Sequence, residues 1–288
     1  MKRWKRSAVF TGITLLLLAA GLFLLALAPQ CAGVRFVLLD RIIAGQESLD
    51  WPETAADAAA MTLEELLADP RTVRRDTLLL VREGHPLPEG YAAPVEEYRD
   101  SGLRMTAETG AAYAALAKEA KERFGTKLYI SSAFRTAEKQ ASLAESQGRY
   151  AAAVGESEHQ TGLALDVYLS GYAGKSLIRC ETGQWLNRWC WQQGFILRYP
   201  YYGEGETGIP WEPWHLRYVG QPHAELIMKN RLTLEGYLSS LQPGRFYACG
   251  DSLISRQQGD ALLVPRAFSR AEVSAVGDGS FVLTFRLH

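Results

Sequence analysis

Two short stretches of this sequence carry side chains of the types that hold a catalytic metal ion. The first runs from Ser157 to Asp166, and the second, Glu212–His215, follows some fifty residues later. Two histidines and one carboxylate make a three-ligand set for zinc with the fourth position left for water, and the stretches supply them as His159, Asp166 and His215. Glu212 stands next to the last ligand, where a general base is needed. The residue types therefore indicate metal-assisted hydrolysis.

The strand and loop predicted around the first stretch determine where its two ligands point. Residues 163–169 alternate as a strand with apolar side chains on one face, so Asp166 faces the other side, towards an open cleft. His159 lies in the loop before this strand, and Gly162 permits that loop to turn tightly. A histidine and an aspartate seven residues apart are a weak signal alone. This stretch by itself predicts only a candidate pair of metal ligands.

The second stretch predicts a bend in the chain. Pro213 favours an extended conformation at Glu212, which excludes a helical pair of ligand and base. Residues three apart in a straight strand face opposite sides. Glu212 and His215 therefore share one water only if the chain bends at Pro213–Trp214. The spacing also leaves open that both side chains only form surface hydrogen bonds.

Arg135 follows a predicted strand over residues 127–131, at the point where the next helix begins. The preceding helix is predicted over Thr106–Phe124, where apolar residues recur at four-residue spacing up to the stop at Gly125. Two interpretations of Arg135 remain open at this point. It is either a solvated arginine at a helix start, or a group that binds a substrate carboxylate or stabilises a developing oxyanion.

Four motifs, taken together and in this order, resemble one enzyme family. They are Ser132–Thr136 followed by Gln140, Ser157–Asp166, Gly194–Pro200, and Glu212–Gly220. The combination is similar to the VanY-type zinc D-alanyl-D-alanine carboxypeptidases, and the resemblance extends over about residues 76–241. One departure is Val154, where the family usually has a proline, and it affects no group proposed for the chemistry.

The resemblance implies a role for each candidate residue. His159, Asp166 and His215 would bind zinc. Glu212 would take a proton from the attacking water and pass it to the departing amine, and Arg135 would polarise the scissile carbonyl and stabilise the oxyanion. Two further residues match positions near the end of the substrate, Gln140 and Ser157.

The activity implied is zinc-dependent hydrolysis of the terminal D-Ala-D-Ala bond of peptidoglycan stem peptides, with release of D-alanine. A D,D-dipeptidase or a peptidoglycan endopeptidase with the same metal site is an alternative. A non-catalytic zinc-containing binding module, as in hedgehog-type domains, is a further one. The presence of Glu212 favours catalysis over the binding module.

The N-terminal region predicts a membrane anchor. After a cluster of four basic residues, the chain runs from Ala8 to Ala28 without a charge, a length of 21 residues. A helix of this length spans the hydrocarbon core of a bilayer, and basic residues before it favour a cytoplasmic N-terminus. We expect a single-pass protein of the cell membrane with its catalytic domain outside the cytoplasm. A cleaved signal peptide and a lipidated Cys31 are the alternatives, and both also place the body outside.

The charge balance gives no support for a nucleic-acid partner. The net charge is −1. Four of the 31 basic residues lie in the N-terminal cluster, so the rest of the chain holds 27 basic and 32 acidic residues. The sequence has no basic stripe with interleaved aromatic residues. We expect a monomer whose partners are the membrane, through the N-terminal helix, and a peptidoglycan stem peptide.

The order of the predicted elements favours an α+β fold. It would contain a small antiparallel sheet flanked by helices with a zinc cleft, an N-terminal transmembrane helix and a small C-terminal β-appendage. The expected division is a cytoplasmic stub and membrane anchor (1–30), an extracytoplasmic spacer (31–75), a zinc D,D-carboxypeptidase domain (76–242) and the β-rich appendage (243–288). Within it we expect a helix over residues 55–67 and a strand over residues 76–82.

Two further expectations concern cysteines and histidines outside the motifs. Four cysteines allow three full pairings, and the preferred disulfide joins Cys180 to Cys190, which flank a predicted helix. His85 and His223 are expected at the surface and not among the ligands.

Overall fold

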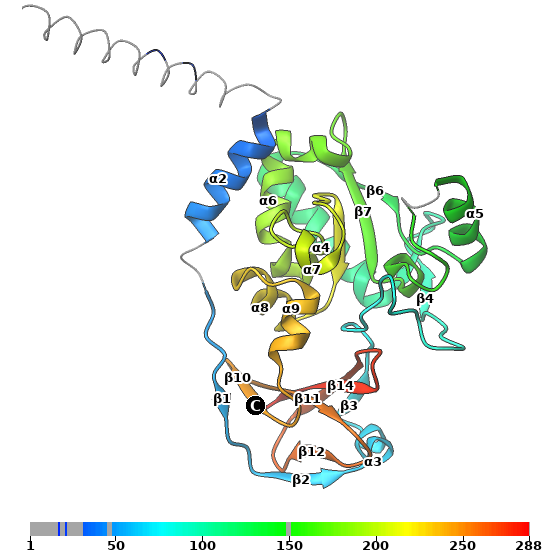
Figure 1. Cartoon of the computed structure of the whole chain (residues 1–288), viewed down its shortest axis with the longest axis vertical. Coiled ribbons are helices and arrows are strands. Elements are labelled where there is room, and N and C mark those ends of the chain that lie inside the picture. Colours follow the sequence, from blue (N-terminus) through cyan, green and yellow to red (C-terminus); the bar gives the residue numbers. More distant parts are fainter. Residues whose placement is uncertain (1–16, 18–20, 22–30, 45–47, 148–150, 288) are drawn as a thin grey trace, which may run out of the picture.

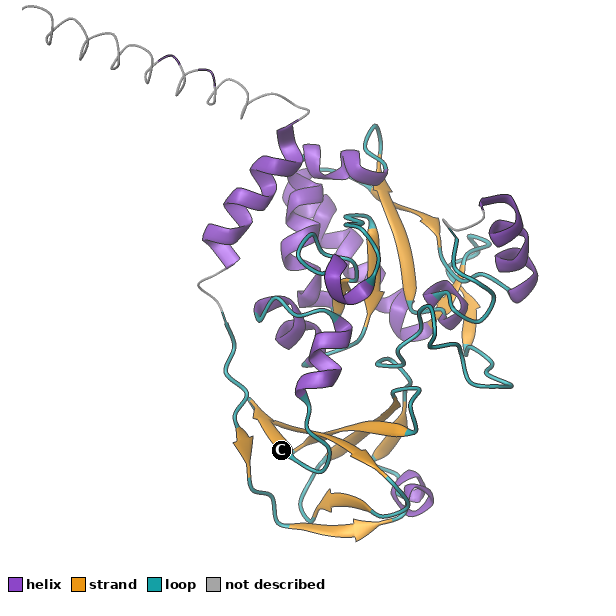
Figure 2. Cartoon of the chain, in the orientation of Figure 1, coloured by secondary structure: helices purple, strands orange, loops and turns teal. Residues whose placement is uncertain are grey.

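The computed structural model describes residues 17, 21, 31–44, 48–147 and 151–287. These residues form two lobes that follow one another along the long axis of Figure 1. The upper lobe, here called the main domain, comprises residues 76–241. The lower lobe, the β module, comprises residues 53–74 and 246–286. Figure 2 shows helices around the strands of the main domain, whereas the β module consists mainly of strands.

A four-stranded antiparallel sheet forms the centre of the main domain. In spatial order its strands are β6 (Leu128–Ser132), β7 (Ala164–Leu169), β9 (His215–Tyr218) and β8 (Phe195–Leu197). The register places Asp166 of β7 opposite His215 of β9. Each pair in this sheet is antiparallel and helices flank it, so the predicted α+β class is confirmed for this domain.

Helices and short turns surround this sheet. They are α4 (Ala107–Phe124), α5 (Ala137–Gln147), η3 (Glu158–Thr161), η4 (Gly174–Arg179), α6 (Glu181–Trp189), η5 (Cys190–Gln193), α7 (Glu204–Thr207), α8 (His223–Lys229) and α9 (Leu234–Ser240). A short antiparallel pair, β4 (Val95–Glu97) and β5 (Arg104–Thr106), precedes α4.

The longest of these helices, α4, confirms the prediction for residues 106–124. The hydroxyl of Thr106 accepts a hydrogen bond from the backbone N–H of Thr109, and Gly125 ends the helix in the left-handed conformation with φ 65°. Leu116 and Ala120 are fully buried and join the apolar residues of the central sheet in one core. The packing of α4 thus supports the strands that carry the candidate ligands.

The strand predicted over residues 76–82 is absent, and that prediction is wrong. The segment is irregular, although Leu78 and Leu79 are each only 1% exposed. The side chain of Arg217 donates hydrogen bonds to the carbonyls of Thr77 and Leu79 at 3.0 and 2.8 Å. Buried backbone groups need partners, and here an arginine supplies them in place of a neighbouring strand.

The β module combines strands from two distant parts of the chain. Its larger sheet has the order β1-β10-β11-β14-β13-β3, and a smaller one pairs β12 with β2. The N-terminal strands are β1 (Glu53–Thr54), β2 (Ala58–Met61) and β3 (Thr72–Arg74). The C-terminal strands are β10 (Phe246–Cys249), β11 (Ser252–Gln258), β12 (Leu262–Pro265), β13 (Arg270–Ala275) and β14 (Ser280–Arg286).

This pairing differs from the expected division into a spacer and an appendage. The predicted boundaries separate strands that the structure pairs, since β1, β2 and β3 each pair with a C-terminal strand. The helix predicted over residues 55–67 is wrong in its first half. The alanine-rich β2 pairs with β12, and the helix α3 (Leu63–Ala68) begins only after Thr62, which forms a capping box with Glu65. Tertiary pairing overrides the helix propensity of the alanines.

Helix α2 (Ala32–Ala44) packs along the side of the main domain (Figure 1). The rings of Phe36 and Trp211 stack with centroids 5.7 Å apart. Asp40 is buried and accepts a hydrogen bond from Nη1 of Arg231 at 2.8 Å. One face of α2 is therefore bound to the main domain by an aromatic stack and an ion pair.

The predicted membrane anchor at residues 8–28 lies outside the described residues, apart from Leu17 and Gly21. Among the residues that the structure describes, no helix has the length and apolar character to cross a bilayer.

The disulfide predicted between Cys180 and Cys190 is wrong, because both thiols are free. They lie at opposite ends of the nine-residue helix α6. At about 1.5 Å per residue their Cα atoms are about 15 Å apart, whereas a disulfide requires less than about 7 Å. Burial raises the pKa of the Cys190 thiol to about 12. This thiol is therefore protonated at neutral pH and packs as a core residue.

His223 was expected at the surface, and the structure buries it. Its Nδ1 is 2.6 Å from the hydroxyl of Tyr237 in α9, and its Nε2 is 2.9 Å from the hydroxyl of Thr284 in β14. The ring thus joins the main domain to the β module. Burial lowers the pKa of His223 to about 3, so the ring is neutral at pH 7.

Replacing His223 by glutamine should make folding less sensitive to acid. The folded pKa of this group is about 3 and the unfolded one about 6.5, so below about pH 6.5 the unfolded chain alone takes up the proton and the native state loses relative stability. Between pH 7 and pH 5 this proton uptake lowers the unfolding free energy of the parent protein by about 2 kcal/mol. His223→Gln has no imidazole at this position and should not show this loss. Urea unfolding of both proteins at the two pH values measures the difference. Equal pH dependence would contradict the assignment.

Candidate metal centre

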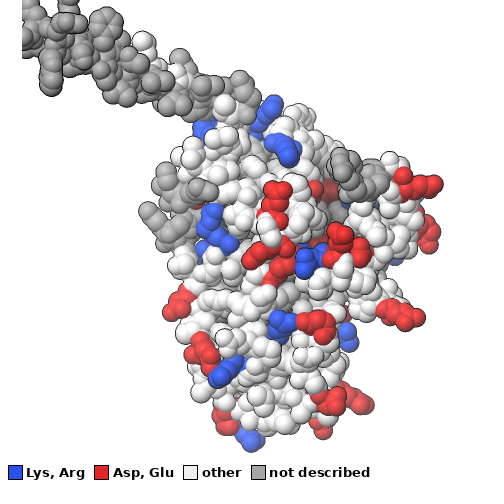
Figure 3. All heavy atoms as spheres, viewed as in Figure 1, with Lys and Arg blue, Asp and Glu red and all other residues white. Residues whose placement is uncertain are grey.

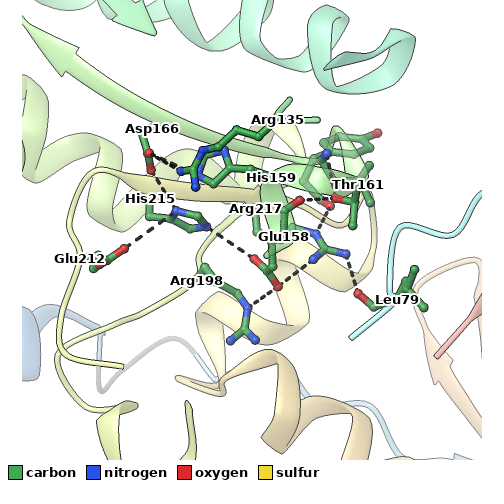
Figure 4. A network of polar contacts seen from close by, with 12 residues as sticks. Leu79, Arg135, Glu158, His159, Thr161, Asp166, Arg198, Glu212, His215 and Arg217 are labelled. Atoms are coloured by element: carbon green, nitrogen blue, oxygen red, sulfur yellow. Dashed lines mark hydrogen bonds and ion pairs between the residues drawn. The ribbon is translucent and has the colours of Figure 1, made fainter. Parts of the chain in front are cut away.

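The three candidate ligands come from one 3-10 helix and two adjacent strands. His159 lies in η3, Asp166 in β7 and His215 at the start of β9. One ligand atom from each lies within 4.8 Å of the other two, and Figure 4 shows the three side chains directed towards one another. The pairing of β7 with β9 brings Asp166 and His215 together although they are 49 residues apart in sequence.

The ring of His159 is fixed by a hydrogen bond from one of its nitrogens. The carbonyl of Ala133 lies 2.8 Å from Nδ1 and is only able to accept, so Nδ1 carries the proton. The lone pair is then on Nε2, which lies 3.2 Å from Oδ2 of Asp166. Burial lowers the pKa of His159, which favours the neutral ring that metals bind.

His215 faces Asp166 with Nδ1, whereas His159 faces it with Nε2. Nδ1 of His215 lies 2.9 Å from Oδ1 of Asp166. The ring packs between His159 and Tyr199, with ring centroids 5.1 and 5.0 Å away. Burial raises the pKa of Asp166, but the two adjacent histidines outweigh it and hold this pKa well below the ordinary value. Asp166 is thus an ionised carboxylate between two imidazoles.

This donor set fits a zinc ion. Catalytic zinc sites in proteins use three ligands of imidazole and carboxylate type. Donor atoms that share one tetrahedral zinc at about 2.1 Å are about 3.4 Å from each other. Nε2 of His159 lies 3.2 Å from Oδ2 of Asp166, and Nδ1 of His215 lies 2.9 Å from Oδ1, so each histidine is close to that spacing from one of the two carboxylate oxygens. His159, Asp166 and His215 are therefore the residues that would hold the metal.

The predicted bend at Pro213–Trp214 is confirmed. These two residues form a turn, closed by a 3.1 Å hydrogen bond from the backbone N–H of His215 to the carbonyl of Glu212. The turn brings Oε2 of Glu212 to 3.9 Å from Nδ1 of His215. Burial raises the pKa of Glu212 above its ordinary value, closer to the pH at which a general base works best.

The residue that holds this turn was not foreseen from the sequence. Asn187 of α6 is 4% exposed and donates from Nδ2 to the carbonyl of Pro213 at 2.8 Å. On the other side, the backbone N–H of Val167 donates to the carbonyl of Trp214 at 3.0 Å. The aromatic residues of α6 predict a helix, but nothing in that pattern identifies a contact 26 residues further along the chain.

Arg135 reaches the metal centre from the loop before α5. Its Nη2 lies 3.6 Å from Oδ2 of Asp166. Nη1 donates to Oε1 of Gln140 at 3.0 Å, and Nε donates to the hydroxyl of Ser132 at 3.1 Å. The guanidinium is therefore oriented by protein contacts and directed to the same centre as the ligands (Figure 4).

The two residues predicted near the substrate are both buried. Gln140 is fully buried, and both ends of its amide are occupied, since Oε1 accepts from Arg135 and Nε2 donates to the carbonyl of Ala152 at 2.7 Å. In this conformation Gln140 orients Arg135. Ser157 is 6% exposed and immediately precedes η3, two residues before His159.

Acidic and basic side chains are interspersed on the face of the molecule in Figure 3, with several acidic groups near the middle of the main domain. On this face of the described residues, lysines and arginines do not gather into one broad patch. A wide basic surface of the kind that binds nucleic-acid backbones is thus absent from this view.

Comparisons with known proteins identify the family. A family model described as VanY, D-alanyl-D-alanine carboxypeptidase, matches residues 102–221. A D-alanyl-D-alanine carboxypeptidase of Enterococcus faecium is 35% identical over 144 residues, which are 50% of this chain and 46% of that protein. The bifunctional D-Ala-D-Ala dipeptidase and D-Ala-D-Ala carboxypeptidase VanXYC of Enterococcus gallinarum is 31% identical over 179 residues, 56% of this chain and 93% of that protein. The chain belongs to the VanY family.

The VanY-type fold also matches a solved structure, VanYB in complex with D-alanine-D-alanine. That chain is 31% identical, with a TM-score of 0.50, and the match covers 58% of this chain and 99% of that one. The chain spans less than half of the length of the Enterococcus faecium relative. The VanY model covers the ligands, Glu212 and Arg135, while the strands of the β module lie outside its range.

Replacing Asn187 by leucine should destabilise the protein through the turn that carries Glu212. The change leaves the carbonyl of Pro213 without its buried donor, which costs about 1–3 kcal/mol of unfolding free energy. Urea unfolding measures the effect. As a control, Gln184→Leu removes a side-chain donor to the carbonyl of Ile178 near the same helix but leaves the turn intact, so turnover of a family substrate should fall only in the Asn187 variant. Wild-type stability and turnover in Asn187→Leu would refute this role.

Proposed function

We propose that this protein is a zinc-dependent D-alanyl-D-alanine carboxypeptidase that removes the terminal D-alanine from peptidoglycan stem peptides. The observation that supports this most directly is the convergence of two histidines, one aspartate and an adjacent glutamate on one centre. Such a set, with an arginine beside it, is an arrangement for hydrolysis. Membership of the VanY family supports the substrate class.

The chemistry follows from the residues around the centre. Zinc held by the three ligands would polarise the scissile carbonyl and lower the pKa of water to about 7. Glu212 removes the proton of the attacking water and returns it to the nitrogen of the departing D-alanine as the C–N bond breaks. The raised pKa of Glu212 suits both transfers, because a base whose pKa lies closer to the working pH both accepts and releases a proton readily.

Arg135 supplies positive charge for the oxyanion that develops on the carbonyl oxygen. Its contacts with Gln140 and Ser132 orient it before the substrate binds, and donors that need no reorientation stabilise a transition state most effectively. We assign Gln140 to the support of Arg135, and Ser157 remains the candidate for contact with the end of the substrate.

A D,D-dipeptidase activity is the second candidate. VanXYC, which is 31% identical, carries both activities in its name. The two reactions break the same D-Ala-D-Ala bond and differ in what lies on the amino side, a peptide or a free amine. The same ligands, base and arginine therefore serve either reaction.

The test is to incubate the purified, zinc-loaded protein with a muropeptide pentapeptide and, separately, with free D-Ala-D-Ala. The proposal predicts release of D-alanine and a tetrapeptide from the pentapeptide. Cleavage of the free dipeptide without cleavage of the pentapeptide would support the second candidate instead. Inactivity on both substrates would refute the proposed function.

Replacing Glu212 by alanine should abolish hydrolysis while zinc remains bound. A general base contributes about 10²–10⁴-fold to such a rate, and a mixed set of histidines and aspartate makes zinc less positive than three histidines would, so we expect a loss at the upper end of that range. Metal analysis and D-alanine release measure the two properties. Glu204→Ala, at an exposed acid of α7, is the matched control and should stay active. Near-normal turnover in the Glu212 variant would exclude its role as the base.

We further propose that residues 8–28 anchor the protein in the cell membrane as a single-pass helix, with the main domain outside the cytoplasm. The charge-free run after a basic cluster supports this. Helix α2 begins at Ala32, four positions after the run ends, and leaves Val34 and Leu38 exposed at 64% and 58%. An apolar outer face is well suited to the membrane surface, where an anchor would place it.

Protease added to intact protoplasts of cells that express the full chain should digest the main domain, because an extracytoplasmic domain is accessible. The chain should also sediment with the membranes and be released by detergent but not by high salt. A main domain that is protected until the cells are lysed, or a chain found in the soluble fraction, would contradict the proposed location.

A further inference from the structure

A buried glutamate lies behind the metal centre, on the side of His215 that faces away from Asp166. The carboxylate of Glu158 is 1% exposed, and its Oε1 accepts hydrogen bonds from Nε of Arg198 and Nη1 of Arg217, both at 2.7 Å. Its other oxygen, Oε2, is buried without a hydrogen-bond partner among the described residues. Figure 4 shows this carboxylate between the two arginines and the ring of His215.

The ring nitrogen nearest to this oxygen also lacks a partner. Nε2 of His215 is buried without a hydrogen bond to a described residue, and it lies 3.5 Å from Oε2 of Glu158. A buried polar atom without a partner costs free energy. A small rotation of either side chain joins these two atoms in one hydrogen bond and satisfies both.

The proton needed for that bond is available when His215 binds a metal. Nδ1 of His215 faces Asp166 and would give its lone pair to zinc, so the single proton of a neutral ring is then on Nε2. Glu158 is suited to accept it because Arg198 and Arg217 both donate to its Oε1, which leaves Oε2, the oxygen nearest to His215, as an available acceptor.

We propose that Glu158 is a positioning residue for the metal ligand His215, and this inference rests on the zinc centre of the proposed function. It accepts the Nε2–H bond, selects the tautomer that presents Nδ1 to zinc, and prevents rotation of the ring. It touches neither the substrate nor the metal. Carboxylates that hold a ligating histidine from behind typically account for 10–100-fold in metal affinity.

The position of Glu158 is set by distant parts of the chain. Both terminal nitrogens of Arg198 donate to the carboxylate of Glu235 in α9, at 2.8 and 2.7 Å. Arg217 donates to carbonyls of the segment at residues 77–79. In that segment, the backbone N–H of Leu78 donates a hydrogen bond to the hydroxyl of Ser274 in the β module. The two arginines therefore connect Glu158, which lies behind His215, to α9 and to the β module.

The test compares Glu158→Gln with Glu235→Gln in the full chain. Both variants remove a carboxylate from the buried Arg198, but only the first changes the group that faces His215. In Glu158→Gln the two arginines hold the amide oxygen on their own side, so the amide NH2, which cannot accept, faces Nε2 of His215. Apparent zinc affinity, measured by competition with a chelator well below the unfolding temperature, should fall about 10–100-fold in Glu158→Gln. It should stay within about twofold of the parent in Glu235→Gln, even where the unfolding midpoint of that variant falls.

Two outcomes would overturn the inference: unchanged zinc affinity in Glu158→Gln, or an equal loss in both variants, which would trace the effect to Arg198. Where Glu158→Gln does not fold, Glu158→Asp keeps the charge and shortens the side chain, so it should fold and still lose affinity. Parent-like affinity in Glu158→Asp would also overturn the inference. Because zinc affinity is read without any substrate, a parent protein that binds zinc but does not hydrolyse the pentapeptide refutes the proposed function alone.

Discussion

The antiparallel pairing of β7 with β9 is the constraint on which the rest of this structure depends. It places Asp166 directly opposite His215, so two candidate ligands reach 2.9 Å from one another through backbone hydrogen bonds of a sheet. Sites built on strands are held more accurately than sites built on loops. The third ligand, His159, needs its own support, and the carbonyl of Ala133 provides it. Once the sheet forms, little remains to be ordered when a metal arrives.

Two turns complete the centre, and each has a clear steric or hydrogen-bonding requirement. The turn before β7 uses Gly162 at φ +73°, where an added Cβ would lie 2.3 Å from a methyl group of Val95, so only glycine fits. The turn at Pro213–Trp214 is held from both sides, by Asn187 and by the backbone of Val167. Without these contacts Glu212 would follow an extended strand and face away from His215.

The core beneath the ligands is charged, which is unusual and has a mechanical consequence. Arg198 and Arg217 are fully buried, and a buried charge is tolerated only with close, well-formed partners. Glu158 partners both of them, and Glu235 and the backbone near Leu79 complete their hydrogen bonds. The stability of this region and the geometry of His215 therefore depend on the same few contacts, which join the centre to α9 and to the β module.

Local patterns were sufficient to predict helix α4 and strand β7, because short spacing and periodicity are properties of neighbouring residues. Residue type and spacing also selected the candidate ligands and base, whose roles the combination of four motifs then implied. Local patterns were insufficient wherever a distant partner controls the outcome. The alanine-rich β2 is a strand because β12 pairs with it. The apolar run at residues 76–82 forms no strand, and two of its carbonyls accept hydrogen bonds from Arg217 in place of a neighbouring strand. The contact of Asn187 with Pro213 and the burial of Glu158 depend in the same way on long-range packing, since no local sequence pattern encodes which residues meet across the fold.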